Sequence, residues 1–237
     1  MRARVLLCLL FISFACAKTE TDCAPANGIT TICGFLATED LEVVPGGRAL
    51  IVGGFSVDND NGDIRALNLQ DGSIQKIYPP DTAALRPEQV EPWGDPKCPG
   101  PPEGFAAHGI LLSARAGGGY TLLVVNHTGR EAVEWLEIAE TECEFAAAWR
   151  GCVVVDEEFW INDVAMLPDG GLVASHMMPR EIAGTLFDRP QNDKVETGYV
   201  VEWQKDGGWK KVPGTEGALP NGIQVSADGS VTVSYTH

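Results

Sequence analysis

The chain has 237 residues, of which 44% are hydrophobic and 21% are charged, a composition typical of a folded domain with one sizeable core. It carries 33 acidic and 17 basic side chains, and its formal net charge of -16 argues against nucleic-acid binding because such a field repels phosphate backbones. The same field favours bound cations. The 27 glycines and 15 prolines suit many short strands joined by tight turns.

Residues 1–17 form a targeting segment in which Arg2 and Arg4 precede an apolar run, residues 5–15. That run is too short to span a bilayer and is typical of a signal peptide. Two processing routes fit the sequence. Ala-Cys-Ala at 15–17 suits ordinary signal cleavage, and Ser-Phe-Ala-Cys at 13–16 resembles an imperfect bacterial lipobox that would lipidate Cys16.

Export follows from either route. We expect a bacterial periplasmic protein or an outer-membrane lipoprotein anchored through Cys16, with secretion as the alternative. We expect residues 18–34 to be an N-terminal segment and residues 35–237 to be the main domain.

An oxidising compartment lets the remaining cysteines form disulfides, and five follow the leader, so one is left over. Cys143 and Cys152 flank EFAAAWRG, which reads as a turn-sized loop, and we expect them to pair. Cys33 has two candidate partners, Cys23 and Cys98. No C-x-x-C occurs, so a zinc or redox site has little support.

Four segments repeat one pattern along the chain: two polar or small residues, an apolar run, a Gly-rich turn and a second apolar run. They are EDLEVVPGGRALIVGG, HGILLSARAGGGYTLLVVNH, NDVAMLPDGGLVASHM and NGIQVSADGSVTVSYTH, which start at Glu39, His108, Asn162 and Asn221. Each is a predicted β-hairpin. Residues 63–69, 74–78, 132–138, 199–204 and 209–212 between them supply further strands, whereas 93–104 and 176–187 read as loops.

Repeated hairpins with extra strands predict an all-β chain folded as a β-propeller, in which the first strand of each blade lines a central channel. The residues that open each repeat then converge on the channel. They are Glu39 and Asp40, His108 and Gly109, Asn162 and Asp163, and Asn221 and Gly222. Carboxylate and amide oxygens without thiolates suit Ca²⁺, although Asn and Asp also commonly begin turns.

These segments resemble the paraoxonase/arylesterase branch of the six-bladed calcium propellers, which is related to the gluconolactonase group. The His-Gly-Ile opening and the Leu-Leu-Val-Val-Asn-His ending of the second repeat are the most specific, and the resemblance extends from about Leu36 to the end. The resemblance implies a catalytic Ca²⁺ held by Glu39, Asn162 and Asn221. It also implies a structural Ca²⁺ held by Asp40, Asp163 and the backbone carbonyl of Ile110.

The same resemblance makes His108 and His127 the pair that activates water. The expected function is therefore calcium-dependent hydrolysis of small carboxylic esters or lactones. The chain ends within the fourth repeat, so an incomplete propeller is expected. We favour a fragment whose missing blades come from the rest of a longer chain, and the alternatives are assembly with another chain and a decayed copy. The alternatives are a non-catalytic exported scaffold with structural calcium and a strictosidine-synthase-like relative.

Overall fold

The computed structural model describes residues 27–56, 62–80, 92–141, 144–183 and 195–236. Two compact units, Met1–Gly34 and Phe35–His237, make up the chain, and every named strand belongs to the second. No helix of the described residues has the length and apolar character needed to cross a membrane.

The described residues of the second unit are all-β, as predicted, and their strands form four sheets. The first sheet contains β1 (Thr38–Val43), β2 (Ala49–Gly54), β3 (Asp63–Asn68) and β4 (Ile74–Tyr78). The second contains β5 (Trp93–Gly94), β9 (Phe145–Val154), β8 (Ala132–Glu140), β7 (Tyr120–Asn126) and β6 (Ala107–Ala114), in that order. The third contains β10 (Ile161–Met166), β11 (Leu172–His176), β12 (Tyr199–Gln204) and β13 (Gly208–Lys211). The fourth contains β14 (Pro220–Val225) and β15 (Thr232–Thr236).

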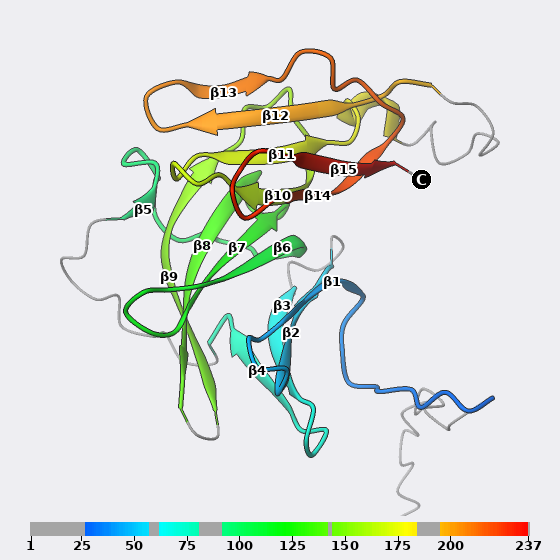
Figure 1. Ribbon diagram of the computed structural model, residues 1–237, viewed down its shortest axis with the longest axis vertical. Coiled ribbons are helices and arrows are strands. Elements are labelled where there is room, and N and C mark those ends of the chain that lie inside the picture. Colours follow the sequence, from blue (N-terminus) through cyan, green and yellow to red (C-terminus); the bar gives the residue numbers. More distant parts are fainter. Residues whose placement is uncertain (1–26, 57–61, 81–91, 142–143, 184–194, 237) are drawn as a thin grey trace, which may run out of the picture. The chain divides into compact units, whose positions relative to one another are not determined.

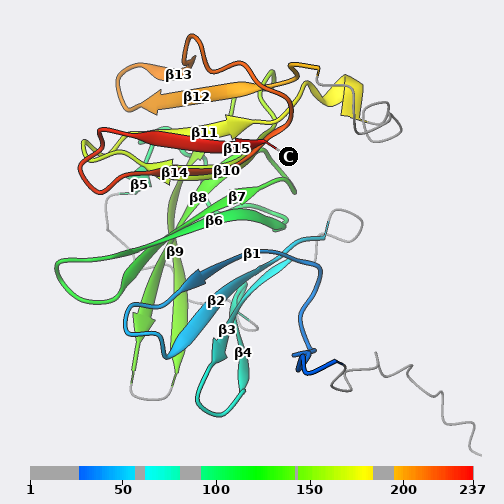
Figure 2. The ribbon, with the colours of Figure 1, turned by 45° about the vertical axis from the view of Figure 1, so that its right-hand side comes forward.

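All four predicted hairpins are present, as β1–β2, β6–β7, β10–β11 and β14–β15. The first strands of consecutive sheets are neighbours in space, with β6 between β1 and β10, and β14 beside β10 (Figures 1 and 2). A short 3-10 helix, η1 (Arg180–Ile182), follows β11.

Three layers of apolar side chains lie between consecutive sheets and hold them together. Strand β7 shows how the sequence builds them. Leu122 and Val124 belong to the layer shared with the first sheet, whereas Leu123 and Val125 belong to the layer shared with the third. Because successive strand residues face opposite ways, a sheet covered on both faces needs the unbroken run Leu-Leu-Val-Val instead of an alternating pattern.

Each of the four first strands carries a β-bulge at the same register. In β1, for example, Thr38 pairs with Gly54 and Leu41 pairs with Val52, so three steps along β1 match two along β2. The residue pairs 108–109, 162–163 and 221–222 occupy the corresponding bulges of β6, β10 and β14. A bulge bends the strand and redirects its side chains, so the polar openings of all four repeats share one local geometry.

The predicted Cys143–Cys152 disulfide is wrong, because Cys152 is joined to Cys98 with their Cα atoms 5.4 Å apart. The segment read as a loop between them is the extended strand β9, in which residues 145 and 152 lie roughly 23 Å apart at about 3.3 Å per residue. Cys143 lies outside the described residues. Cys33 is also disulfide-bonded, and since Cys98 is already paired, the Cys33–Cys98 alternative is excluded.

Glu134 is a fully buried carboxylate in the middle of β8, and three donors satisfy it. Nε and Nη2 of Arg130 each donate to it over 2.8 Å, and Nε1 of Trp149 donates over 2.8 Å. A buried charge is tolerated only when such partners replace its hydration.

Glu134→Ala should therefore lower the free energy of unfolding by about 3–5 kcal/mol, because it leaves the charge of Arg130 unpaired in the interior. Urea denaturation monitored by circular dichroism measures the change. Glu144→Ala, at an exposed site near the start of β9, is the matched control and should shift stability by less than about 0.5 kcal/mol. Equal stability of the two variants would contradict a structural role for the Glu134 cluster.

Candidate functional site

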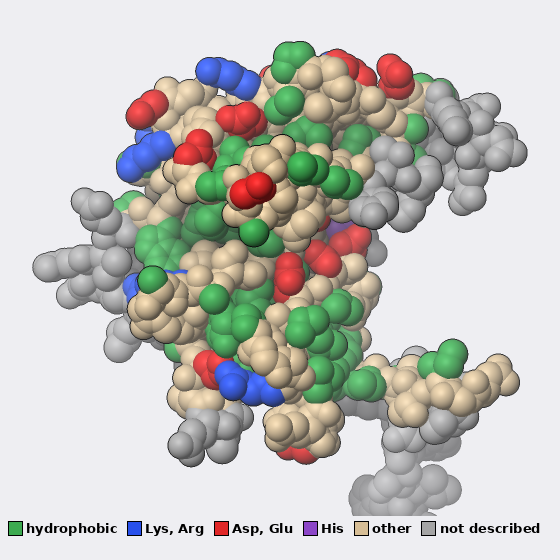
Figure 3. All heavy atoms as spheres, viewed as in Figure 1, with side chains coloured by type: hydrophobic (Ala, Val, Ile, Leu, Met, Phe, Trp, Pro, Cys, Tyr) green, Lys and Arg blue, Asp and Glu red, His purple; other side chains and the backbone are tan. Residues whose placement is uncertain are grey.

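A small cleft of about 100 Å³ lies where the bulges of β1, β6, β10 and β14 meet. Its lining consists of Glu39, Asp40, Gly109, Asn162, Asp163, Asn221 and Gly222. All five acidic and amide side chains predicted as metal ligands thus line one cleft. On the molecular surface, Asp and Glu side chains gather there beside a histidine (Figure 3).

Two aspartates of the cleft join neighbouring sheets through hydrogen bonds. Oδ2 of Asp40 accepts the backbone N–H of Ile110 over 2.8 Å, and Oδ2 of Asp163 accepts that of Ile223 over 2.7 Å. In both carboxylates Oδ1 accepts the backbone N–H of the next residue along the chain. The backbone N–H of Ile110 is therefore the group that contacts Asp40. The role of the Ile110 carbonyl as a calcium ligand stays a prediction.

The second bulge position alternates between aspartate and glycine from one sheet to the next. Gly109 is required by the close approach of its neighbour, because a Cβ there would collide with Oδ1 of Asp163. A Cβ at Gly222 would lie 3.8 Å from Oδ2 of the same aspartate, which is an ordinary contact, so that position does not require glycine.

Burial makes the charged forms of these aspartates costly. It raises the pKa of Asp163 to about 7, although hydrogen bonds from Ile223 and Val164 act in the opposite direction and the charges of Asp40 and Glu39 add to the rise. Burial likewise raises the pKa of Asp40. None of the seven residues that line the cleft is cationic, so no side chain there offsets the acidic charge.

The donor set fits calcium by type. The set predicted for one ion has a single carboxylate and two amides, and the deeper set has two carboxylates and a backbone carbonyl. No group of three His, Cys, Asp or Glu side chains in the described part of the chain could hold a metal ion by itself. Carboxylate, amide and backbone oxygens together are the ligands that Ca²⁺ prefers, so these residues would hold it.

His108 and His127 contact each other beside the cleft, with Nδ1 of His108 2.7 Å from Nε2 of His127. The other nitrogen of His108 faces the cleft residues. Nε2 lies 3.2 Å from Nδ2 of Asn162 and 3.2 Å from Oε1 of Glu39. The structure thus brings the predicted histidine pair next to the predicted metal ligands.

Aromatic rings screen this pair from water. The ring of Phe55 lies 4.8 Å from that of His108 and 5.9 Å from that of His127, and the ring of Trp160 lies 6.1 Å from that of His127. Burial lowers the pKa of His127, and the nearby Glu131 only partly offsets this effect. The neutral imidazole is therefore favoured at His127.

Asn126 holds the backbone on which both histidines lie. It is fully buried, accepts the N–H of Ala106 and donates to the carbonyl groups of Gly104 and Thr128. Its side chain is therefore occupied, which excludes glycosylation of the Asn-His-Thr pattern at this position in the folded protein.

Glu131 and Arg180 are the site residues that sequence reasoning missed. Oε1 of Glu131 lies 2.7 Å from Nδ1 of His127, and its second oxygen forms an ion pair with Arg180 of η1. The only sequence signal was the four-residue spacing between His127 and Glu131. Nothing in the sequence connects them to Arg180, which is far along the chain.

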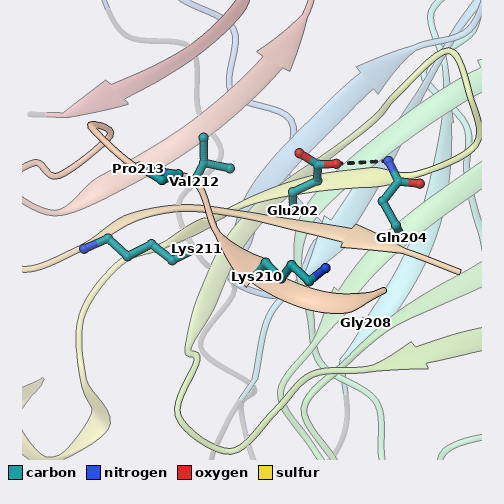
Figure 4. A pocket seen from close by; sticks show the side chains of 7 residues that line it. All are labelled: Glu202, Gln204, Gly208, Lys210, Lys211, Val212 and Pro213. Carbon is teal, nitrogen blue, oxygen red and sulfur yellow. Dashed lines mark hydrogen bonds between the residues drawn. The ribbon is translucent and has the colours of Figure 1, made fainter. Parts of the chain in front are cut away.

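A second hollow, of about 230 Å³, lies beside β12 and β13 and has a different chemistry. Its side chains include Lys210, Lys211 and Glu202, whose carboxylate accepts a hydrogen bond from Gln204 over 3.0 Å (Figure 4). It contains no histidine and no group of acids. The cleft at the bulges is therefore the better candidate site.

No protein-family model matches the chain, and no curated protein matches it at a significant level. The functional assignment therefore depends on the residues of the cleft themselves.

The raised pKa of Asp163 predicts how the free energy of unfolding depends on pH when a chelator removes Ca²⁺. The folded protein holds this proton up to a pH of about 7, whereas the unfolded chain releases it near 3.8, so this contribution to stability is lost as the pH rises between those values. The Asp163→Asn variant has no titrating carboxyl group at this position, so its stability lacks this dependence on pH. The wild type should therefore lose up to about 1.4 kcal/mol per pH unit relative to that variant.

Urea denaturation at pH 4, 5, 6 and 7 measures the difference between the two proteins. Asp206→Asn, at an exposed turn, controls for removal of one acidic residue. Adding Ca²⁺ should abolish the wild-type decline because a bound cation favours the ionised carboxylate. Parallel pH curves for the wild type and Asp163→Asn would contradict this account.

Proposed function

We propose that the protein is a calcium-dependent hydrolase of small carboxylic esters or lactones, with the architecture of a partial β-propeller. The observation that carries this proposal is the meeting of four polar strand openings in one cleft, directly beside a buried histidine pair. Hard oxygen donors and a neutral general base are the two components that such a reaction needs.

His108 has the position of a general base. Its Nε2 faces the cleft, and its Nδ1 contacts His127, which is able to accept a proton passed through the ring. Phe55 and Trp160 limit the access of bulk water to the pair. Asn162 donates through Nδ2 to His108, an arrangement that leaves its Oδ1 available as a ligand.

A bound Ca²⁺ would supply a Lewis acid that polarises the carbonyl group of the substrate and stabilises the developing oxyanion. Glu39, Asn162 and Asn221 are the proposed ligands of this ion. Asp40, Asp163 and Ile110 are proposed to hold a second, structural ion.

One observation favours the alternative of a non-catalytic scaffold. Asp40 and Asp163 tie neighbouring sheets together, so an ion at these residues stabilises the fold without any turnover. Measurement of turnover in chelator, and again after Ca²⁺ is added back, distinguishes the hydrolase from the scaffold.

The propeller architecture is supported by the two outermost sheets. Leu41 and Val43 on β1 are 50% and 54% exposed, and Val231 and Val233 at β15 are 53% and 47% exposed. The opposite faces of these sheets are covered by apolar layers, so exposed valine and leucine on their uncovered faces suit packing against further sheets. We propose that additional blades cover them.

Hydrolysis of phenyl acetate and of a small lactone tests the function. The wild type should lose turnover in chelator and regain it with Ca²⁺. Asn162→Ala and Glu39→Ala should each lower kcat by about 100-fold or more, because each removes a ligand of the ion that stabilises the oxyanion. Glu202→Ala, in the second hollow, is the matched control and should retain wild-type turnover.

His108→Gln should lower kcat by about 100- to 10,000-fold by removing the base, while leaving Ca²⁺ affinity largely intact. Isothermal titration with Ca²⁺ measures that affinity. A wild type that is stabilised by Ca²⁺ but shows no turnover above background would establish the scaffold and reject the hydrolase.

A further inference from the structure

A buried carboxylate lies at the end of the histidine pair opposite to Glu39. Glu131 immediately precedes β8, and its Oε1 is 2.7 Å from Nδ1 of His127. These two atoms are buried, and neither forms a regular hydrogen bond with any group of the described residues. Burial of both atoms is costly unless they pair with each other, and at 2.7 Å each is within hydrogen-bonding distance of the other.

Glu131 is itself fixed from the other side. Its second oxygen forms an ion pair with Arg180, and the guanidinium carbon of Arg180 lies 5.2 Å from the centre of the Trp160 ring. This ion pair orients the carboxylate, and the indole ring limits the positions that the arginine adopts.

The charge of Glu131 determines where the protons of the histidine pair reside. An ionised carboxylate accepts hydrogen bonds and donates none, so the proton of His127 belongs on Nδ1. Its Nε2 is then an acceptor, and the 2.7 Å contact requires Nδ1 of His108 to be the donor. His108 is left with an unprotonated Nε2, which is the atom that faces the cleft.

Glu39 favours the opposite arrangement. Its Oε1 lies 3.2 Å from Nε2 of His108 and would attract a proton to that nitrogen, which reverses both tautomers and removes the base. The side chain of Glu39 is 31% exposed, whereas that of Glu131 is 10% exposed. The less solvated carboxylate acts through the lower effective dielectric and therefore exerts the stronger influence.

We propose that Glu131 is a positioning residue that holds the proton of His127 on Nδ1, so that His108 presents an unprotonated Nε2 to the cleft. The role of that nitrogen as a base rests on the proposed hydrolase function. The tautomer itself does not, since it is argued from the contacts and burial of the two carboxylates.

Nitrogen-15 NMR of the imidazole rings tests the tautomer directly, because protonated and unprotonated ring nitrogens resonate far apart. The chain has four histidines, so each is assigned by single substitution. Wild-type His127 should show a protonated Nδ1 and an unprotonated Nε2. Glu131→Ala removes the carboxylate and should interchange the two nitrogens, whereas Glu131→Gln, which keeps an acceptor oxygen but not the charge, should shift the pattern less than Glu131→Ala.

Glu137→Ala, on β8 and paired with Arg115 and Arg150, is the matched control and should leave the pattern of His127 unchanged. A wild-type His127 protonated on Nε2, or an unchanged pattern in Glu131→Ala, would overturn the proposal. The wild-type spectrum decides by itself if the alanine variant does not fold.

Kinetics then test the positioning role. Glu131→Ala should lower kcat for phenyl acetate by about 10–100-fold with little change in KM, and Glu131→Gln should retain more activity than Glu131→Ala. Wild-type kcat in Glu131→Ala would overturn the role in catalysis. A wild type without turnover would reject the hydrolase, whereas the NMR pattern would still decide the tautomer.

Discussion

The site depends on two carboxylates that each span neighbouring sheets. A bulge in a first strand leaves a backbone N–H without its ladder partner, and a buried amide must find one. Asp40 satisfies Ile110, and Asp163 satisfies Ile223, so each aspartate fastens one sheet to the next at the point where their side chains converge. The fold and the site therefore share the same hydrogen bonds.

That arrangement concentrates acidic groups where burial penalises their charge. The raised pKa values of Asp40 and Asp163 show that hydrogen bonding does not fully offset desolvation. Glu39 adds a third acidic group, and no lysine or arginine lines the cleft. A divalent cation, as proposed above, would relieve this repulsion, and the electrostatic cost of the joints between sheets would then contribute to affinity for the ion.

The repeat pattern was sufficient to predict the hairpins and the cleft residues, because a polar pair before an apolar run marks each first strand. Pairing over long sequence distances was not predictable. Cys152 pairs with Cys98 because β9 is extended and β5, which precedes Cys98 in the chain, runs parallel to it with Trp93 opposite Gly151. Arg180 lies in η1, after β11 of the third sheet, whereas Glu131 lies just before β8 of the second sheet. A single sequence carries no signal for a contact between them.

The two glutamates at the ends of the histidine pair favour opposite tautomers of the two imidazole rings. Glu39 lies among the cleft oxygens, and Glu131 lies in a buried ion pair with Arg180. A cation bound by Glu39 would engage its lone pairs and weaken its attraction for the proton of His108, whereas Glu131 is not among the residues that line the cleft. Charge in the cleft and proton position in the histidine pair are then coupled, because one carboxylate is a ligand and the other is not.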